Sequence, residues 1–161
     1  METKSPCCHL YVEAKMLEIY PGELDVDAIF AKWRKWGADK NYGAFITFVG
    51  TVRKEGGIEA LSFDLYEPIL RQWFDEWQDR AKERGAYLRM AHSVGNVPVH
   101  TSSFMAAVFS PKRRVALELI EEFVEDFKAN APIWKYDVKN GERIYAKDRS
   151  QKIKGSGLLD I

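Results

Sequence analysis

Two lysines flank a proline break near the carboxyl end of the chain, in the segment EDFKANAPIWKYDV (125–138). Lys128 precedes Pro132 on a helix-like pattern, and Lys135, seven positions after Lys128, follows the proline on a strand-like run. A lysine amine attracts anions, and it can move a proton near neutral pH when burial and neighbouring cations favour its neutral form. Each lysine taken alone is explained more simply as a solvated charge, because cations are favourable in a last helical turn and on an exposed strand face. The pattern itself leaves open whether the two amines share a pocket.

A second group of cations lies where a long helix is expected to begin. Lys112, Arg113 and Arg114 follow Ser110-Pro111, at the helix end where the dipole favours acids and repels cations. Their presence is explained if they and the free backbone N–H groups hold an anion such as a phosphate. The simpler alternative is a solvated basic turn. Arg53 is another cation at an element boundary, where a strand gives way to a glycine-bearing loop.

Residue patterns do not support several other kinds of site. The chain has no G-x-S-x-G elbow and no Walker or dinucleotide-binding glycine pattern. Cys7-Cys8-His9 has no ligand spacing for zinc and lies in a polar leader, so we predict neither a metal nor a cofactor. The 24 basic and 24 acidic residues cancel, which disfavours nucleic-acid or membrane binding through an overall positive field. No apolar run resembles a signal peptide or a membrane span, and we expect a cytoplasmic protein.

The elements that must position these cations follow from periodicity and turn residues. A chain of 161 residues, 46% of them hydrophobic, can form one domain with its own core. Pro132 ends the long helix just after Lys128, and Asn140-Gly141 predicts a type I′ hairpin turn. Because several strands are joined by hairpins, we expect an α+β fold. The predicted elements are strands at 10–19 and 43–53, a strand at 58–66 paired with the latter, helices at 24–37, 67–85 and from Ser110-Pro111 to Pro132, strands at 86–95 and 103–110, and a hairpin at 133–147.

Two motifs resemble those of the large subunit of molybdopterin synthase, the MoaE family. KANAPIWK (128–135) matches the family pattern K-x-x-A-P-x-W-K in full, and GAFITFVGTVR (43–53) resembles its strand-and-turn signature. Between them, FSPKRRVALELIEEFVEDFK (109–128) stands where the family has a Ser-x-His-Arg turn and a long helix. The resemblance covers residues 10–147, expected to form the catalytic domain between a flexible polar leader (1–9) and a C-terminal tail (148–161). It implies an α/β-hammerhead type of fold with an additional antiparallel β-sheet subdomain.

The resemblance implies a sulfurtransferase. The family converts cyclic pyranopterin monophosphate (precursor Z) into molybdopterin by adding the two sulfurs of the dithiolene. The sulfur arrives as a thiocarboxylate on the C-terminal Gly-Gly of a small ubiquitin-like subunit, whose tail inserts into the large subunit. The resemblance further implies a homodimer within a heterotetramer. Because the partner brings the sulfur, the chain itself needs no reactive cysteine, metal or cofactor.

Site residues carry over from the family by motif. Lys128 and Lys135 match its two catalytic lysines, and we expect Lys128 to be the main catalytic amine. A lysine ammonium would orient the anionic thiocarboxylate, and arginines at a helix N-terminus would hold the cyclic phosphate. The predicted substrate-binding residues are Thr51, Val52, Arg53, Lys112, Arg113, Lys128, Lys135, Tyr136 and Asp137.

The chain departs from the family pattern in three places. Lys112 stands where the family usually has histidine, LYEPILRQW (65–73) is irregular, and Arg143-Ile144-Tyr145 replaces a run containing tryptophan. The match of Lys147 to a basic residue of the family depends on this last region. Lys112 keeps open an alternative, a catalytically inactive partner-binding scaffold of the same fold. Single-stranded nucleic-acid binding through aromatic strands and the basic turn is a third hypothesis, which the zero net charge disfavours.

Overall fold

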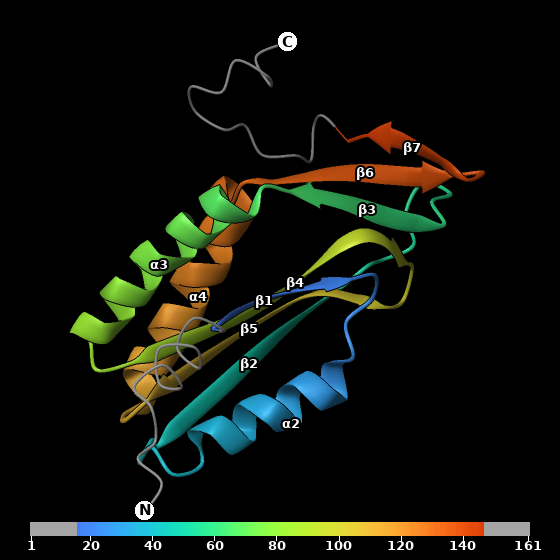
Figure 1. Ribbon diagram of the computed structural model, residues 1–161. Helices are drawn as coiled ribbons and strands as arrows, with labels where there is room; N and C mark the ends of the chain where they lie inside the picture. Colours follow the sequence, from blue (N-terminus) through green and yellow to red (C-terminus); the bar gives the residue numbers. More distant parts are fainter. Residues whose placement is uncertain (1–15, 147–161) are drawn as a thin grey trace, which may run out of the picture.

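The computed structural model describes residues 16–146 (Figure 1). Strands and helices alternate along this range, as the pattern of apolar residues predicts. The elements are β1 (Leu17–Pro21), α2 (Val26–Gly37), β2 (Ala44–Thr51), β3 (Ala60–Leu65), α3 (Glu67–Glu83), β4 (Tyr87–Pro98), β5 (Ser102–Ser110), α4 (Arg113–Asn130), β6 (Ile133–Lys139) and β7 (Glu142–Tyr145).

The described strands form one sheet in the order β2-β5-β4-β3-β6-β7, with β1 beside β4. The β1–β4 pair is parallel and the other pairs are antiparallel. β4 joins two parts of the sheet, because its first half pairs with β5 and β1 whereas Gly95–Pro98 pair with β3. The α+β class is therefore confirmed, and β3, β6 and β7 form its additional antiparallel part (Figure 1).

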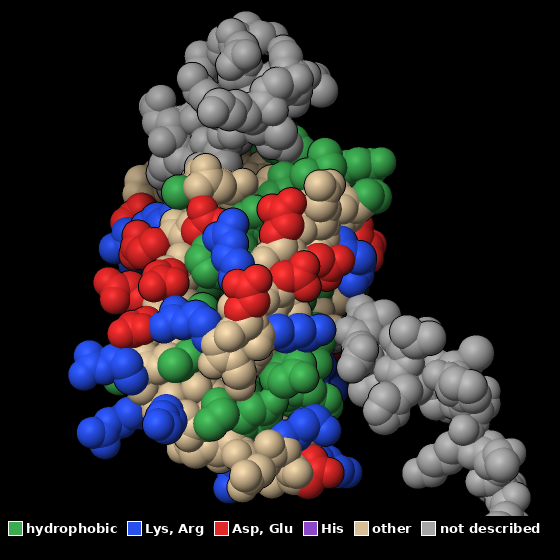
Figure 2. Space-filling view, turned by 90° about the vertical axis from the view of Figure 1, so that its left-hand side faces the viewer, with side chains coloured by type: hydrophobic (Ala, Val, Ile, Leu, Met, Phe, Trp, Pro, Cys, Tyr) green, Lys and Arg blue, Asp and Glu red, His purple; other side chains and the backbone are tan. Residues whose placement is uncertain are grey.

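Helices cover both faces of the sheet. α3 and α4 lie on one face and α2 lies on the other (Figure 1). Successive side chains of a strand point to opposite faces, so β5 contributes to both cores. Phe104, Ala106 and Val108 pack beneath α3 and α4, whereas Met105, Ala107 and Phe109 pack beneath α2. The outer surface on the α3 side carries basic and acidic side chains intermixed, rather than a field of one sign (Figure 2).

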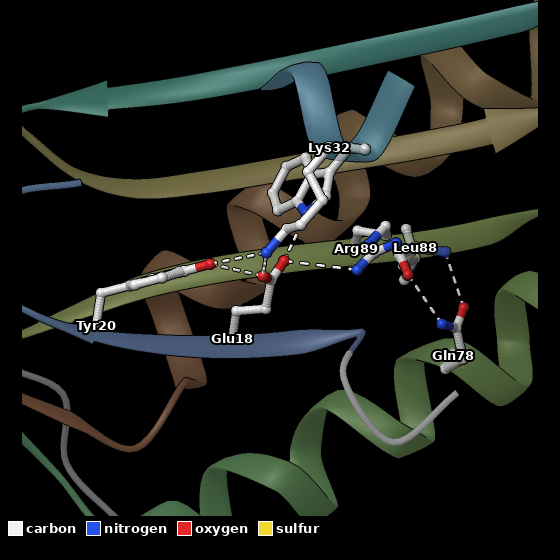
Figure 3. Close-up of polar contacts among 7 residues, drawn as sticks. Glu18, Tyr20, Lys32, Gln78, Leu88 and Arg89 are labelled. Atoms are coloured by element: carbon white, nitrogen blue, oxygen red, sulfur yellow. Dashed lines mark hydrogen bonds and ion pairs between the residues drawn. The ribbon is translucent and has the colours of Figure 1, made fainter. Parts of the chain in front are cut away.

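A buried polar cluster fastens α2 to the sheet (Figure 3). Glu18 of β1 accepts hydrogen bonds of 2.6 Å from Trp33 Nε1 and of 2.6 Å from Tyr20 OH. The same carboxylate forms ion pairs with Lys32 of α2 and, at 3.6 Å, with Arg89 of β4. Burial lowers the pKa of Arg89 to about 10, so its guanidinium stays charged at neutral pH and needs this carboxylate.

Polar contacts also hold α3 in place. Gln78 exchanges two hydrogen bonds of 2.8 Å with the backbone of Leu88 on β4 (Figure 3). Asp126 of α4 accepts hydrogen bonds from the indole nitrogens of Trp73 (3.1 Å) and Trp77 (2.6 Å) of α3. Because Asp126 lies half a turn before Lys128, these bonds fix the end of α4 that carries this lysine.

Local predictions from single elements are largely confirmed. Asp25 caps α2 through a 3.1 Å hydrogen bond from the backbone N–H of Ala28 to its carboxylate. Asn140 and Gly141 both have positive φ, 50° and 74°, as a type I′ turn between β6 and β7 requires. The strand predicted at 10–19 corresponds to β1, and its first residues lie outside the described range.

One predicted strand pairing is wrong. The 58–66 segment was expected to form a hairpin with 43–53, but β3 pairs with β4 and β6, and β2 pairs with β5. The chain turns away after β2, because the backbone of Val52 bonds to Thr101 O (2.9 Å) and accepts from His100 N (2.7 Å). The strand predicted at 86–95 is longer than expected, because β4 continues to Pro98.

Candidate active site

The junction between α4 and β6 carries the two lysines. Lys128 lies in the last turn of α4. Ala131 then adopts an extended conformation, with φ −63° and ψ 134°, while its N–H still bonds to Phe127 O at 3.1 Å. Pro132 disfavours a helical residue before it, so the helix stops and the chain continues as β6. Lys135 of that strand lies opposite Phe63 of β3.

Lys128 and Lys135 line the same cavity. Its volume is about 630 Å³, which is within the range of small-molecule sites. Apolar and aromatic side chains from β2, β3, β5 and α4 form much of its wall, including Phe48, Phe63 and Phe104. Charged groups therefore lie beside a weakly polar surface, where they interact more strongly with an anion than they would in water.

Arg53 is the third cation of this cavity, on the loop after β2. Its side chain is 80% exposed and forms an ion pair of 2.5 Å with Glu55, which also lines the cavity. An anion that binds Arg53 must compete with this carboxylate. The sequence motif predicted Arg53 at the site but did not reveal this competitor.

Thr51 and Val52, the other residues predicted on this loop, also line the cavity. Thr51 Oγ1 lies 3.5 Å from Ser102 Oγ, at the edge of hydrogen-bond distance. Val52 is 2% exposed, and its backbone is bonded on both sides to residues 100 and 101. Its side chain thus belongs mainly to the core. Thr51 and Val52 together anchor the end of β2, from which Arg53 extends.

Lys112 and Arg113 lie at the other end of α4. Lys128 lies fifteen positions after Arg113 along this helix, which corresponds to about 22 Å. The Ser110 hydroxyl bonds to the backbone of Lys112, the N-cap residue of α4, accepting from Lys112 N (3.3 Å) and donating to Lys112 O (2.8 Å). A single chain therefore does not bring this basic turn to the cavity, and the turn's phosphate-binding role stays a prediction.

Tyr136 and Asp137 have different surroundings. Tyr136 points to the face of β6 opposite to Lys135, because side chains alternate along a strand, and the Arg143 guanidinium lies 3.9 Å from its ring centroid. Burial raises the pKa of Tyr136, and the nearby Asp64 carboxylate raises it further. Asp137 lies on the same face as Lys135, two residues further along β6. Neither lines the cavity in the described chain, so their substrate contacts stay predictions; Lys147 lies outside the described residues.

His92 of β4 is a cavity residue to which sequence reasoning assigned no role. Its ring is 2% exposed and packs edge-on against Phe63, with ring centroids 5.0 Å apart. Burial lowers the pKa of His92 to about 4; the hydrogen bond to Ser93 O opposes this effect, and the charge of Lys135 adds to it. The only signal in the sequence was an ionisable residue within an otherwise strand-like apolar run.

Other classes of site have no geometric counterpart in the described residues. Between residues 16 and 146, no three His, Cys, Asp or Glu side chains converge as a metal site. No helix in this part of the chain is long and apolar enough to cross a membrane.

The α+β fold and its cavity with two lysines define a protein that can bind an anionic substrate between a helix end and a sheet. The model of the MoaE protein family matches residues 19–130. Over 144 residues the chain is 51% identical to the molybdopterin synthase catalytic subunit of Helicobacter pylori (strain ATCC 700392 / 26695), covering 89% of this chain and 99% of that relative. The chain belongs to the MoaE family.

More distant relatives and solved structures agree. The molybdopterin synthase catalytic subunit of Bacillus subtilis (strain 168) is 30% identical over 132 residues, covering 78% of this chain and 82% of the relative. A solved protein–protein complex of subunits 1 and 2 of molybdopterin-converting factor from Helicobacter pylori 26695 matches with a TM-score of 0.84 and 51% identity, over 89% of this chain and 99% of that one. Molybdopterin synthase from Staphylococcus aureus has the same fold, with a TM-score of 0.70 at 24% identity over 81% and 96% of the two chains.

Proposed function

We propose that this chain is the catalytic subunit of a molybdopterin synthase, a sulfurtransferase that converts cyclic pyranopterin monophosphate into molybdopterin. The observation that carries the proposal is that Lys128 and Lys135, from a helix and a strand, line one cavity. Family membership and the 51% identical relative support the same activity. The protein acts in the cytoplasm.

The sulfur donor is a small ubiquitin-like subunit with a thiocarboxylate at its C-terminal glycine. The Helicobacter pylori relative was solved as a complex of two subunits, which supports such a partner here. A largely apolar wall with cations beside it suits an extended Gly-Gly tail that ends in an anion. The ammonium groups of Lys128 and Lys135 attract this anion and direct its sulfur towards the substrate.

Sulfur transfer requires proton movement as well as orientation. The thiocarboxylate sulfur attacks a carbon of the pyranopterin side chain, forming a C–S bond while a C–O bond breaks. The departing oxygen must receive a proton, and water must then release the sulfur from the acyl group of the partner. We assign the main proton transfer to Lys128 and a positioning or acid–base role to Lys135, since proton transfer needs a group within hydrogen-bond reach.

The substrate phosphate is held by arginine side chains. Arg53 reaches it from the rim of the cavity after release from Glu55. The basic turn with Lys112 and Arg113 lies about 22 Å from Lys128 in the same chain. In the homodimer that we propose, a second copy supplies this turn to the cavity, where its free N–H groups and guanidinium bind phosphate. The assembly is then a heterotetramer with one small subunit on each copy.

Reconstitution tests this function. The purified chain is mixed with thiocarboxylated small subunit and cyclic pyranopterin monophosphate, and the dithiolene product is measured. Lys128→Ala is expected to lower turnover by about 100-fold or more while the melting temperature and the dimer stay nearly unchanged. Lys35→Ala, an exposed lysine of α2, is the matched control and keeps full activity.

Two results would contradict these assignments. Full activity of Lys128→Ala would show that this lysine is not the catalytic amine. A stable complex of the wild-type protein with the small subunit that makes no dithiolene would favour the inactive scaffold instead.

A further inference from the structure

Among the described residues that line the cavity, His92 alone carries an ionisable ring, and it has no part in the mechanism above. It lies on β4, in the wall between the lysine-bearing elements and β5. Phe63 connects it to Lys135, because Phe63 lies opposite Lys135 in the β3–β6 pair and its ring contacts His92 edge-on. The rings of Phe104 and Phe127 also pack against the imidazole at tilted angles, with centroid distances of 6.0 Å and 5.6 Å.

The backbone determines the tautomer of this ring. Nδ1 of His92 lies 2.7 Å from the carbonyl oxygen of Ser93. A carbonyl can only accept, so Nδ1 carries the proton and donates it to this bond. The pKa of His92 is lowered to about 4, so the ring is neutral at physiological pH. Nε2 therefore presents a lone pair, and among residues 16–146 no donor binds it.

The charges around the cavity explain what such a lone pair can do. Arg53 and Glu55 face it from the loop after β2, Lys128 from α4 and Lys135 from β6, while β3 and β5 contribute uncharged side chains. A carboxylate next to a lysine would neutralise the ammonium that attracts the thiocarboxylate. A neutral acceptor orients the ammonium by a hydrogen bond and leaves its charge available.

We propose that the Lys135 side chain, which lines the same cavity, rotates so that its ammonium donates a hydrogen bond to Nε2 of His92, a bond that the structure itself does not contain, and that this bond holds the amine in position for sulfur transfer. His92 is then a positioning residue, which acts through Lys135. Its effect on turnover rests on the function proposed above, whereas the contact itself does not.

Three substitutions separate this role from a purely structural one. His92→Gln places an amide oxygen, which can accept a hydrogen bond, near the position of Nε2. His92→Asn keeps only a donor near Nδ1, which can bond to Ser93 O. His92→Phe keeps the aromatic packing without either nitrogen. A hydrogen bond to a charged group contributes about 1.5–3 kcal/mol. We therefore expect kcat to fall about 10- to 100-fold in His92→Phe and His92→Asn, and to recover most of this loss in His92→Gln. Melting temperatures of all three verify folding.

An NMR measurement tests the contact without any turnover. The ¹⁵N resonance of His92 Nε2 is expected to move towards that of an unbonded nitrogen in Lys135→Met, while the Nδ1–H resonance stays in place. Lys128→Met is the control and leaves Nε2 unchanged. If the wild-type protein makes no dithiolene, the proposed function fails while the NMR result still decides the contact. The inference is overturned by an Nε2 resonance that Lys135→Met does not move, or by activity that Asn restores and Gln does not.

Discussion

Replacing Glu18 with glutamine is expected to lower the free energy of unfolding by about 3 kcal/mol. The side chain of Glu18 is 10% exposed, and four groups converge on it from β1, α2 and β4 (Figure 3). Glutamine has nearly the same shape, but it carries no charge and offers one acceptor oxygen instead of two. The change therefore removes the counter-charge while leaving the packing intact.

The magnitude follows from the burial of the partners. Breaking a buried ion pair by removing one member costs about 3–5 kcal/mol, because the other charge stays buried. Arg89, with 6% of its side chain exposed, is in this position, whereas Lys32 is 49% exposed and can be rehydrated. The loss should consequently lie at the lower end of the range. For a chain of this size, such a loss lowers the melting temperature by about 6–12 °C.

Thermal and urea unfolding measure this effect. Glu23→Gln makes the same change at an exposed position close to Glu18 in the sequence. It is the matched control and should leave stability nearly unchanged. Most of the cost comes from losing the carboxylate beside the buried Arg89 guanidinium, so adding Arg89→Met should cost at least about 1 kcal/mol less in the Glu18→Gln background than in the wild type. Equal stability of the Glu18→Gln and Glu23→Gln proteins, or strict additivity in this cycle, would refute the reasoning.

Two further perturbations address packing and pH. Gly37→Ala should destabilise the protein by about 1–3 kcal/mol, because the new Cβ would lie 2.3 Å from Cε1 of the packed Phe109 ring. This cost should outweigh the helix preference of alanine. A free energy of unfolding equal to or above that of the wild type would contradict this prediction. Lowering the pH from 7.5 to 5 should reduce the free energy of unfolding by about 2 kcal/mol through His92, since the unfolded imidazole binds a proton near pH 6.5 and the buried one only near pH 4. Stability is thus lost as pH falls below about 6.5, and urea titrations at several pH values should show this slope flattened in His92→Gln but kept in His100→Asn.

The local structure of this protein was largely predictable. The cap at Asp25, the turn at Asn140-Gly141 and the helix stop at Pro132 each depend on residues within a few positions of one another. Their dihedral preferences and side-chain hydrogen bonds act over that same short range. A single sequence therefore contains the information that defines them.

Strand pairing was less predictable. The alternation in 58–66 predicted a strand correctly, but the strand packs between β4 and β6 instead of beside β2. Pairing partners are chosen by burial of both sheet faces and by the path of the connecting loops, which involve contacts distant in sequence. The same limit applies to His92, whose role depends on Phe63 and Lys135 from two other strands.

The sequence by itself determined which residues can do the chemistry: two lysines on either side of a proline, and an arginine at the end of a strand. Only the tertiary structure decided that these three cations meet at one cavity, that Glu55 competes for Arg53, and that Arg113 lies at the far end of α4. The physical reason is the rigidity of the elements. A helix separates its two ends by a fixed rise per residue, whereas a stop at Pro132 and the pairing of β6 with β3 return the chain to the point where the helix ends.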